Sequence, residues 1–256
     1  MHKYPTMSLC QVHWFSQVIG KTVGAYVILP DVGKPPFATF YLLHGLSDDY
    51  TIWLRRTRIE WYVRKLPLIV VMPDGFRGFY TNHAKGPAYA TYIGEELPAF
   101  IERNFPALPE RSFRCIGGLS MGGYGALRVA LAYPDRFASA NSHSGCLAIA
   151  NLKNEHLPAY EWLPMFGPKP AGAKHDLVHL AKLALKSPPL PQLRIDCGRD
   201  DFLIQHNRFY HRQLQKLRIA HEYEEFLGEH TWDYWDKHVR EALRFHARGL
   251  GLKEVE

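Results

Sequence analysis

One serine of this sequence is enclosed by glycines, in a pattern that could form a nucleophile. Residues 117–127 read GGLSMGGYGAL, and Gly118-Leu119-Ser120-Met121-Gly122 within them matches G-x-S-x-G. In this pattern the serine occupies a sharp, strained turn between a strand and a helix, with its hydroxyl exposed. The apolar run before Ser120 and the helix-compatible run after it supply that setting. A glycine-rich turn with an incidental serine is the alternative, whereas a phosphate-binding loop would carry a lysine that is absent here.

A serine hydroxyl is a weak nucleophile until a base accepts its proton and an acid orients that base. In hydrolases built this way the acid and then the histidine follow the serine along the chain, each after a strand. The strand-like run at 223–227 ends in a turn that carries His230, which we predict to be the base. The run at 192–198 leads to Asp200 and Asp201, and both remain candidates for the acid. Either could instead cap the helix that begins near residue 202.

The reaction also needs two N–H donors that face the developing oxyanion. The residue after the nucleophile supplies one of them, so the first predicted donor is the backbone of Met121. The second should come from a loop after an earlier strand, where the sequence reads LLHGLSDD. Gly45 permits that turn and the Leu46 N–H is the predicted donor. His44 precedes the serine in the chain, so we expect it to stabilise this loop rather than to act as a base.

Alternating strand-like and helix-like segments would position these groups. Two alternating runs in the first thirty residues suggest antiparallel strands, and continuous apolar runs at 37–43, 68–73 and 113–118 suggest strands covered on both faces. Helical spacing is found at 52–65, 90–105, 121–133, 202–217 and 232–247. The pattern predicts an α/β fold with a mostly parallel central sheet and helices on both faces. We expect residues 1–256 to form a single domain, with the Pro-rich segment 147–190 as a small lid-like insertion.

Composition and charge narrow the function further. The net charge is +6, but lysines and arginines are dispersed and their densest cluster, 55–58, is short. We therefore expect no binding of nucleic acid. The N-terminus lacks a secretory signal, and the longest apolar runs are too short to span a bilayer, so we expect no membrane association. Four cysteines occur without CxxC spacing, which favours free thiols and a cytoplasmic location.

A metal hydrolase is the next alternative. His175 and His179 are four residues apart on a predicted helix, like half of a zinc site. The apolar side of that helix faces away from them, so we expect both to face solvent and to bind no metal. His206 and His211 are five apart and do not share a helix face either.

Six stretches of the sequence resemble the esterase D type of the putative esterases. They are YLLHGLSDDYTIWLRRT, VVMPDG, GFYTN, GLSMGGYGALRVAL, DCGRDDF and GEHTWDYW, and the similarity runs from about residue 8 to 247. The sequence around WLRRT and SMGGYGA most resembles that of the bacterial tributyrin-type esterases. The group also includes S-formylglutathione hydrolases and acetyl and feruloyl esterases. The resemblance implies an α/β-hydrolase fold and no metal or organic cofactor. Members of this group often form dimers or larger assemblies, so the resemblance is also compatible with a homo-oligomer.

The resemblance also assigns roles to residues. The family's nucleophile falls on Ser120 and its base on His230, and its G-x-x-D pattern, counted from Gly198, places the acid on Asp201 rather than Asp200. We therefore expect a serine carboxylesterase that hydrolyses short-chain acyl esters of small molecules through an acyl-enzyme. Alternatives are a thioesterase like S-formylglutathione hydrolase, a feruloyl or acetyl xylan esterase, an acyltransferase, or a non-catalytic binding module of hydrolase fold.

Four aromatic residues are candidates for the wall of the substrate pocket, although ordinary packing would explain them equally well. They are Trp53, Tyr80, Trp162 and Phe166.

Overall fold

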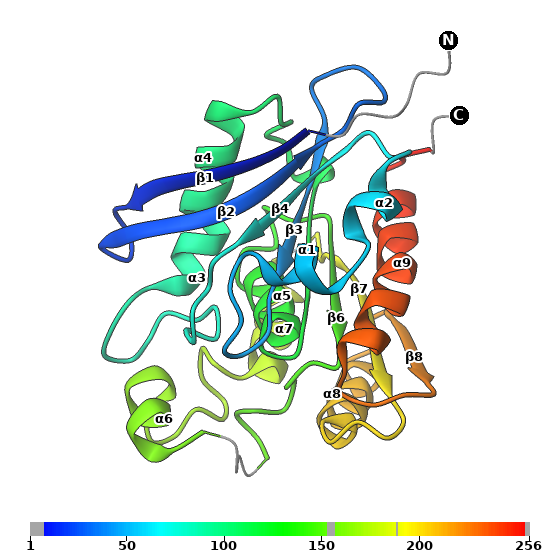
Figure 1. The fold of residues 1–256 in the computed structure, drawn as a ribbon. Coiled ribbons are helices and arrows are strands. Elements are labelled where there is room, and N and C mark those ends of the chain that lie inside the picture. The colour runs from blue at the N-terminus through cyan, green and yellow to red at the C-terminus, as the bar shows by residue number, and fades with distance from the viewer. Residues whose placement is uncertain (1–7, 153–156, 188, 254–256) are drawn as a thin grey trace.

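The computed structural model describes residues 8–152, 157–187 and 189–253. Its centre is an eight-stranded sheet with the strand order β1-β2-β4-β3-β5-β6-β7-β8 (Figure 1). The strands are β1 (Ser8–Ser16), β2 (Lys21–Leu29), β3 (Ala38–Leu43), β4 (Leu68–Pro73), β5 (Arg114–Leu119), β6 (Ser139–His143), β7 (Gln192–Gly198) and β8 (Glu222–Phe226). β1 pairs antiparallel with β2, and β2 pairs antiparallel with β4, whereas all pairs from β4 to β8 are parallel. The mostly parallel sheet predicted from the sequence is thereby confirmed.

Helices cover both faces of the sheet (Figure 1). The helical segments are α1 (Ile52–Arg56), α2 (Ile59–Val63), α3 (Tyr89–Thr91), the π-helical η1 (Tyr92–Glu96), α4 (Leu97–Asn104), the 3-10 turn η2 (Arg111–Phe113), α5 (Met121–Ala132), α6 (Ala159–Phe166), α7 (Leu177–Ala184), α8 (Ile204–Lys216) and α9 (Trp232–Gly249). The apolar sides of α1, α2 and α9 join one buried cluster, and those of α4, α5, α7 and α8 join the other. The sheet is therefore the middle of three layers.

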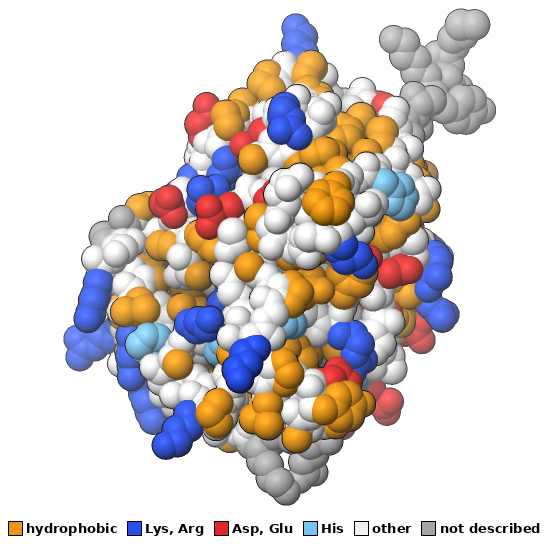
Figure 2. Space-filling model, turned by 90° about the vertical axis from the view of Figure 1, so that its left-hand side faces the viewer, with side chains coloured by type: hydrophobic (Ala, Val, Ile, Leu, Met, Phe, Trp, Pro, Cys, Tyr) orange, Lys and Arg blue, Asp and Glu red, His pale blue; other side chains and the backbone are white. Residues whose placement is uncertain are grey.

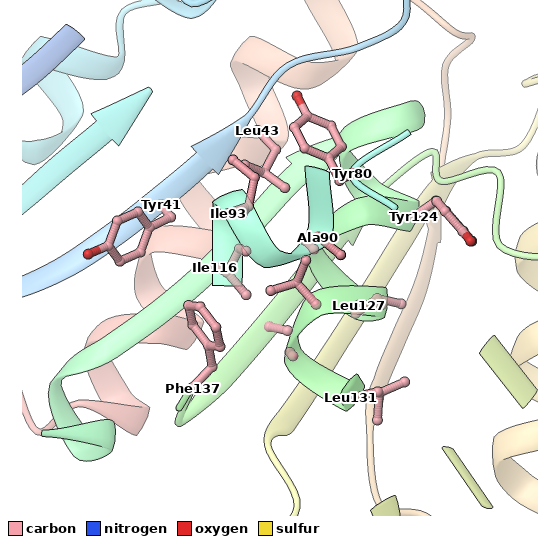
Figure 3. Packing of buried hydrophobic residues seen from close by; sticks show 14 of the residues in the cluster. Tyr41, Leu43, Tyr80, Ala90, Ile93, Ile116, Tyr124, Leu127, Leu131 and Phe137 are labelled. Atoms are coloured by element: carbon pink, nitrogen blue, oxygen red, sulfur yellow. The ribbon is translucent and has the colours of Figure 1, made fainter. Parts of the chain in front are cut away.

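The central strands are apolar on both sides because both sides are covered. Successive residues of β3 alternate between the two clusters: Phe40 and Leu42 contact the layer of α9, while Tyr41 and Leu43 contact the layer of α5. Figure 3 shows the second of these layers, where side chains of β3 and β5 meet those of η1 and α5. Period-two alternation of two apolar sets produces the continuous apolar runs seen in the sequence.

One predicted helix is divided in the structure. The single helix expected at 52–65 is split into α1 and α2, because Thr57 is extended (φ −135°, ψ 170°) and the Arg58 N–H donates to Asp236 of α9 instead of to a helical carbonyl. The segment 147–190 contains α6 and α7, and residues 153–156 and 188 of it lie outside the described residues. The part of the chain that is described contains no helix long and apolar enough to cross a bilayer.

Candidate active site

Ser120 lies between the end of β5 and the first residue of α5, at the carboxyl edge of the sheet. Its backbone has φ +52° and ψ −114°, a conformation that costs a non-glycine residue of the order of 1–3 kcal/mol. The Ser120 N–H donates to the carbonyl of His143 at 2.9 Å, so the neighbouring strand β6 holds the turn in place. This is the strained strand-to-helix turn that the G-x-S-x-G pattern predicts, and it directs the serine side chain away from the sheet.

Close contacts with neighbouring atoms leave no room for a side chain at the glycines around the serine. A Cβ atom on Gly118 would lie 2.7 Å from the carbonyl carbon of Gly122, and one on Gly122 would lie 2.6 Å from the carbonyl oxygen of His44. A Cβ on Gly123 would lie 2.4 Å from the Ser142 Oγ. Real Cβ atoms do not approach other atoms this closely, so a side chain at any of these positions would displace the turn or the helix.

His230 reaches Ser120 from the loop after β8, and Asp201 reaches His230 from the loop after β7. The His230 Nε2 lies 3.1 Å from the Ser120 Oγ, and the His230 Nδ1 lies 3.0 and 2.9 Å from the two carboxylate oxygens of Asp201. The Asp201 side chain is fully buried and the His230 side chain is 16% exposed. Three side chains that are far apart in sequence thus meet in one hydrogen-bonded chain at the edge of the sheet.

The carboxylate fixes which nitrogen of His230 carries the proton. An ionised carboxylate only accepts hydrogen bonds, so the Nδ1 facing Asp201 must be protonated, and in the neutral ring the Nε2 lone pair then faces the serine hydroxyl. Asp201 also accepts the Leu203 N–H at 2.8 Å, which helps to fix the orientation of the carboxylate. The arrangement can therefore remove a proton from Ser120 and stabilise the resulting imidazolium.

Two glycines bring the acid and base loops into contact. A Cβ on Gly198 would lie 2.3 Å from the carbonyl oxygen of Gly228, and that same oxygen accepts the Asp200 N–H at 3.1 Å. The backbone of Asp200 therefore joins the loops, while its side chain is exposed. Of the two aspartates, Asp201 is the one whose carboxylate lies against His230.

The two predicted oxyanion donors lie beside the serine. Leu46 and Met121 both line the cavity that contains Ser120, and a Cβ on Gly45 would lie 3.9 Å from the Ser120 Cβ. Within the described residues neither the Leu46 N–H nor the Met121 N–H donates a hydrogen bond. The Met121 N–H is also at the first position of α5, where a helix leaves its amide groups without a helical partner. Both amides are therefore without an acceptor among the described residues, next to the serine.

Two of the four predicted pocket aromatics, Trp53 and Tyr80, brace the end of β3 instead of lining the cavity. The Trp53 indole N–H donates to the Leu43 carbonyl at 3.1 Å, and the Tyr80 hydroxyl donates to the His44 carbonyl at 3.1 Å. Both side chains are buried in the layers of the fold. Their polar ends satisfy carbonyl groups that Gly122 approaches, because a buried donor needs an acceptor. Neither residue lines the cavity around Ser120 among the described residues.

His44 stabilises this loop, as expected. Its Nε2 accepts the Gly75 N–H at 2.8 Å, so its proton lies on Nδ1, which is 2.7 Å from the carbonyl oxygen of Gly45. The ring thereby joins the loop after β3 to the loop after β4, and it holds the Leu46 amide in position.

The other two predicted pocket aromatics, Trp162 and Phe166, lie one layer behind the cavity. The Phe166 ring centroid is 5.4 Å from that of Phe79, which itself lines the cavity, and Trp162 packs on Phe166 with centroids 4.5 Å apart. Neither ring lines the cavity around Ser120 among the described residues. Helix α6 therefore supports Phe79 from behind.

The cavity around Ser120 has a volume of about 400 Å³ and a mostly apolar wall. Besides Ser120 and His230 it is lined by Gly45, Leu46, Asp48, Phe79, Leu119, Met121, Cys146, Ile149, Leu157, Phe202, Leu203, His206, Trp232 and Trp235. Phe202 and Trp232 are missed by sequence reasoning although each directly or nearly follows a predicted site residue in the chain. The sequence feature that could have identified them is this position, because a residue close in sequence to a functional group on a loop can line the same cavity.

Two ionisable groups of the wall are shifted by burial. Burial raises the pKa of the Cys146 thiol to about 12, so this thiol stays protonated at neutral pH and donates to the Ser120 carbonyl oxygen, 3.6 Å from its Sγ. A protonated thiol is a poor nucleophile and does not compete with the serine. Burial also raises the pKa of the Asp48 carboxyl above its usual value.

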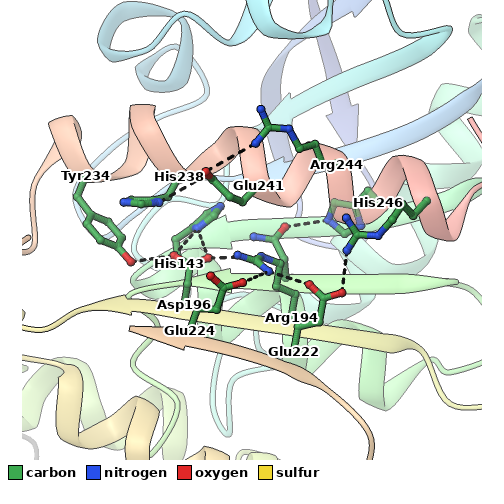
Figure 4. A network of polar contacts seen from close by, with 12 residues as sticks. His143, Arg194, Asp196, Glu222, Glu224, Tyr234, His238, Glu241, Arg244 and His246 are labelled. Carbon is green, nitrogen blue, oxygen red and sulfur yellow. Dashed lines mark hydrogen bonds and ion pairs between the residues drawn. The ribbon is translucent and has the colours of Figure 1, made fainter. Parts of the chain in front are cut away.

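A second aspartate–histidine pair lies behind the serine. The His143 Nδ1 is 2.9 Å from Asp196, and the Tyr234 hydroxyl donates to the same carboxylate at 3.0 Å (Figure 4). Both side chains of the pair are fully buried. The His143 Nε2 has no hydrogen-bond partner among the described residues.

The pair of histidines considered for a metal does not form a site. His175 precedes α7 and is buried, with its Nδ1 2.8 Å from the Thr81 hydroxyl, so the expectation that it faces solvent is wrong. The reason is that α7 begins at Leu177, and helical spacing therefore does not apply to residue 175. Among residues 8–152, 157–187 and 189–253 no group of three or more potential ligands could hold a metal ion.

The chain belongs to the Putative esterase family, whose family model matches residues 16–246. An acetyl esterase of Caldicellulosiruptor saccharolyticus is 32% identical over 260 residues, which cover 93% of this chain and 98% of the relative. Two solved structures from Staphylococcus aureus are each 31% identical in sequence to this chain. One is a fluorophosphonate-binding serine hydrolase F with substrate bound, with a TM-score of 0.86 and coverage of 94% of this chain and 98% of that one. The other is an S-formylglutathione hydrolase without ligand, with a TM-score of 0.83 and coverage of 94% and 99%.

These similarities extend over nearly the whole chain. They confirm the family expected from the sequence motifs and the α/β-hydrolase fold. The protein is a carboxylic ester hydrolase of the serine esterase kind.

Proposed function

We propose that the protein hydrolyses short-chain acyl esters through a triad of Ser120, His230 and Asp201. The observation that carries the proposal is the continuous hydrogen-bonded chain from the Ser120 Oγ to the His230 imidazole and on to the Asp201 carboxylate, with 3.1 Å and 2.9 Å between the joined atoms. The serine end of this chain opens into a cavity, and its carboxylate end is buried.

In the first half of the reaction the Ser120 Oγ attacks the ester carbonyl carbon, and its proton moves to the His230 Nε2. The tetrahedral intermediate collapses when the bond to the alcohol oxygen breaks, and the alcohol takes that proton as it leaves. In the second half a water attacks the acyl-enzyme, its proton moves to Nε2, and collapse returns the proton to the serine. Asp201 stays ionised and stabilises the imidazolium in both halves.

The oxyanion of each intermediate is stabilised by the N–H groups of Leu46 and Met121 in this proposal. Support comes from their place beside Ser120 and from the absence of any other acceptor for them among the described residues. Donors that are already oriented need no reorganisation when charge develops, and losing one such donor costs about 10²- to 10³-fold in kcat in related chemistry.

The acyl group is small in this proposal. The cavity of about 400 Å³ is shared by the acyl group and the reacting atoms, and its size is at the low end for ligand pockets. The named relatives act on small groups as well, since one is an acetyl esterase and another an S-formylglutathione hydrolase. The latter similarity makes a thioester the second candidate substrate. A tributyrin-type specificity also fits the apolar wall.

Two wider expectations belong to the same proposal. We infer that residues 1–256 act as one domain in which the segment 147–190 covers the catalytic side, because Ile149 and Leu157 from this segment line the cavity. We also infer that the enzyme works in the cytoplasm, since all four cysteines are free thiols.

The test is the hydrolysis of p-nitrophenyl esters of increasing acyl length, together with S-formylglutathione, by the wild-type enzyme and by Ser120→Ala. We expect kcat/KM to be highest for acetate to butyrate and to fall for longer chains. Ser120→Ala should lower hydrolysis roughly 10⁴-fold or more, because the remaining groups cannot form the acyl-enzyme.

The two parts of the proposal fail separately. Activity retained by Ser120→Ala would overturn the triad, whereas a preference for long acyl chains in the wild-type enzyme would overturn the substrate class alone.

A further inference from the structure

A second concavity lies between α2 and the C-terminal half of α9, away from the catalytic cavity. Its volume is about 660 Å³, and it shares no lining residue with the cavity around Ser120. Figure 1 shows α2 and α9 side by side at this place. Its apolar floor consists of Leu66, Leu243, Ala247 and Leu252. We call this concavity the basic groove.

The name refers to its other lining residues. Six of them are basic and none is acidic, and they come from two segments of the chain that are widely separated in sequence. The first segment flanks α2 and contributes Arg58, Arg64 and Lys65, and the second is α9, which contributes Arg240, Arg244 and Arg248.

These six cations equal the whole charge excess of the protein. The chain has 31 lysines and arginines against 25 aspartates and glutamates, a net charge of +6. Outside the basic groove the two kinds of charge are therefore equal in number. Figure 2 shows the side of the molecule away from α2 and α9, where basic and acidic side chains both occur. The basic groove therefore brings together as many cations as the chain has in excess over its acidic residues.

Four of these six cations have no anionic partner among the residues that the structure describes. In the described part of the chain Arg58, Arg64, Lys65 and Arg240 form no ion pair with a carboxylate. Arg244 and Arg248 do pair, with Glu241 at 3.8 Å and with Glu222 at 2.7 Å. The Asp236 carboxylate accepts the Arg58 backbone N–H and the Tyr62 hydroxyl, and it forms no ion pair with a guanidinium group among the described residues.

Their spacing on α9 adds to the repulsion. Arg240, Arg244 and Arg248 are four residues apart, so they form a row on one side of the helix. Like charges at this spacing destabilise a helix. The row extends about 12 Å along the helix. An anion that binds between this row and the cations of α2 would remove the repulsion from both sides.

Aromatic rings complete the groove. Trp61 lines it with 58% of its surface exposed, and the Arg64 guanidinium lies 3.8 Å from its ring centroid. The Arg240 guanidinium lies 5.5 Å from the ring of Tyr62. A ligand that fits here needs negative charge for the cations and a planar or apolar part for the rings and the floor.

We propose that the basic groove binds a small organic polyphosphate of nucleotide size. The phosphates would lie between the basic residues of α2 and α9, and the planar part against Trp61 and the apolar floor. The volume of the groove falls within the range of small-molecule sites, and its concave shape favours such a ligand over an extended polyanion. The site is separate from the triad, so this proposal does not depend on the proposed esterase mechanism.

The first test is isothermal titration calorimetry of the full chain with ATP, in EDTA and about 50 mM salt. We expect one site per chain. Arg240→Gln/Arg244→Gln should weaken binding at least tenfold, and Lys182→Gln/Arg212→Gln, which removes the same charge elsewhere, should not weaken it more than twofold. All of these side chains are exposed, so the fold should persist, and circular dichroism checks this.

The second test separates stacking from charge. Trp61→Ala should weaken ATP binding about fivefold or more and leave inorganic pyrophosphate binding unchanged, since base–aromatic stacking contributes about 1–3 kcal/mol. Hydrolysis of p-nitrophenyl acetate should stay at the wild-type rate in each groove variant.

Three results would overturn the proposal: no heat of ATP binding to the wild-type chain, equal binding by the Arg240/Arg244 variant, or equal affinity for ATP and pyrophosphate. Tighter binding of a 20-nucleotide oligothymidylate than of ATP would also overturn it, because the groove would then be part of a nucleic-acid surface.

Discussion

The molecule contains two aspartate–histidine pairs with nearly the same internal geometry and different surroundings. The pair Asp201–His230, which we call the rim pair, and the pair Asp196–His143, which we call the buried pair, each have an oxygen–nitrogen distance of 2.9 Å. The His230 Nε2 faces the Ser120 hydroxyl at the wall of a cavity. The His143 Nε2 faces no partner among the described residues, and the Tyr234 hydroxyl donates to the same Asp196 oxygen, Oδ1, that the His143 Nδ1 contacts.

The difference shows that an aspartate–histidine pair is not by itself a catalytic unit. General-base catalysis requires a proton to accept and room for a substrate, and only the rim pair has both. The buried pair belongs to a larger polar network of β6, β7, β8 and α9, which includes Arg194 with Glu222 and Glu224 (Figure 4). Burial and the neighbouring Asp196 carboxylate raise the pKa of Tyr234 far above its usual value, so Tyr234 remains a donor to that carboxylate.

The largest expected effect separates the rim pair from its exposed neighbour. Asp201→Asn should lower kcat for p-nitrophenyl acetate about 10⁴-fold, because the amide can hold His230 in the wrong tautomer. Asp200→Asn removes a carboxylate from the adjacent, exposed position and should change kcat less than about threefold, within the usual range for surface substitutions. Comparable losses in the two variants would contradict the assignment of the acid.

A smaller effect tests what places the rim pair at the cavity. Gly198→Ala puts a methyl group 2.3 Å from the Gly228 carbonyl oxygen, so the acid and base loops must separate. We expect kcat/KM to fall about 10²-fold, since displacements near 1 Å can cost that much.

Gly249→Ala is the matched control for this change. Its new methyl group meets the end of the flexible Gln192 side chain at 3.0 Å, and the residue belongs to α9, so activity should stay within about twofold of wild type. A fully active Gly198→Ala enzyme would show that loop contact does not position the pair.

The smallest expected effect on activity comes from the buried pair. Asp196→Asn should lower the free energy of unfolding by about 3 kcal/mol, because it breaks a fully buried interaction, while kcat per folded molecule changes less than about tenfold. Urea denaturation together with active-site titration measures both quantities. A loss of kcat as large as that of Asp201→Asn, with unchanged stability, would mean that the buried pair takes part in the chemistry.

Much of the fold was predictable because the periodicity of apolar residues can be recognised within each short segment of the sequence. Strands such as β7 and helices such as α5 follow from apolar runs and helical spacing, since both faces of the sheet are covered. The triad residues were accessible for a different reason: strand ends, glycine turns and chain order restrict the choice of histidine and acid.

What the sequence did not reveal depends on contacts between distant segments. Chain order selects Asp201 and His230, but no pattern predicts that Asp196 and His143 form a second, buried pair with nearly the same distance. Trp53 and Tyr80 were assigned to the pocket because their aromatic character fits a substrate wall, and only the acceptors at the end of β3 show otherwise. The basic groove was hidden because its two sets of cations, at 58–65 and 240–248, are dispersed along the chain and meet only in the fold.

The most direct test of the central claim is to label the enzyme with a fluorophosphonate and locate the adduct by peptide mass spectrometry. The account predicts one adduct per chain, on Ser120 in the peptide that begins α5, with labelling slowed at least 10³-fold in His230→Ala because the base is lost. An adduct on another serine, or full esterase activity in an enzyme whose Ser120 stays unlabelled, would contradict it.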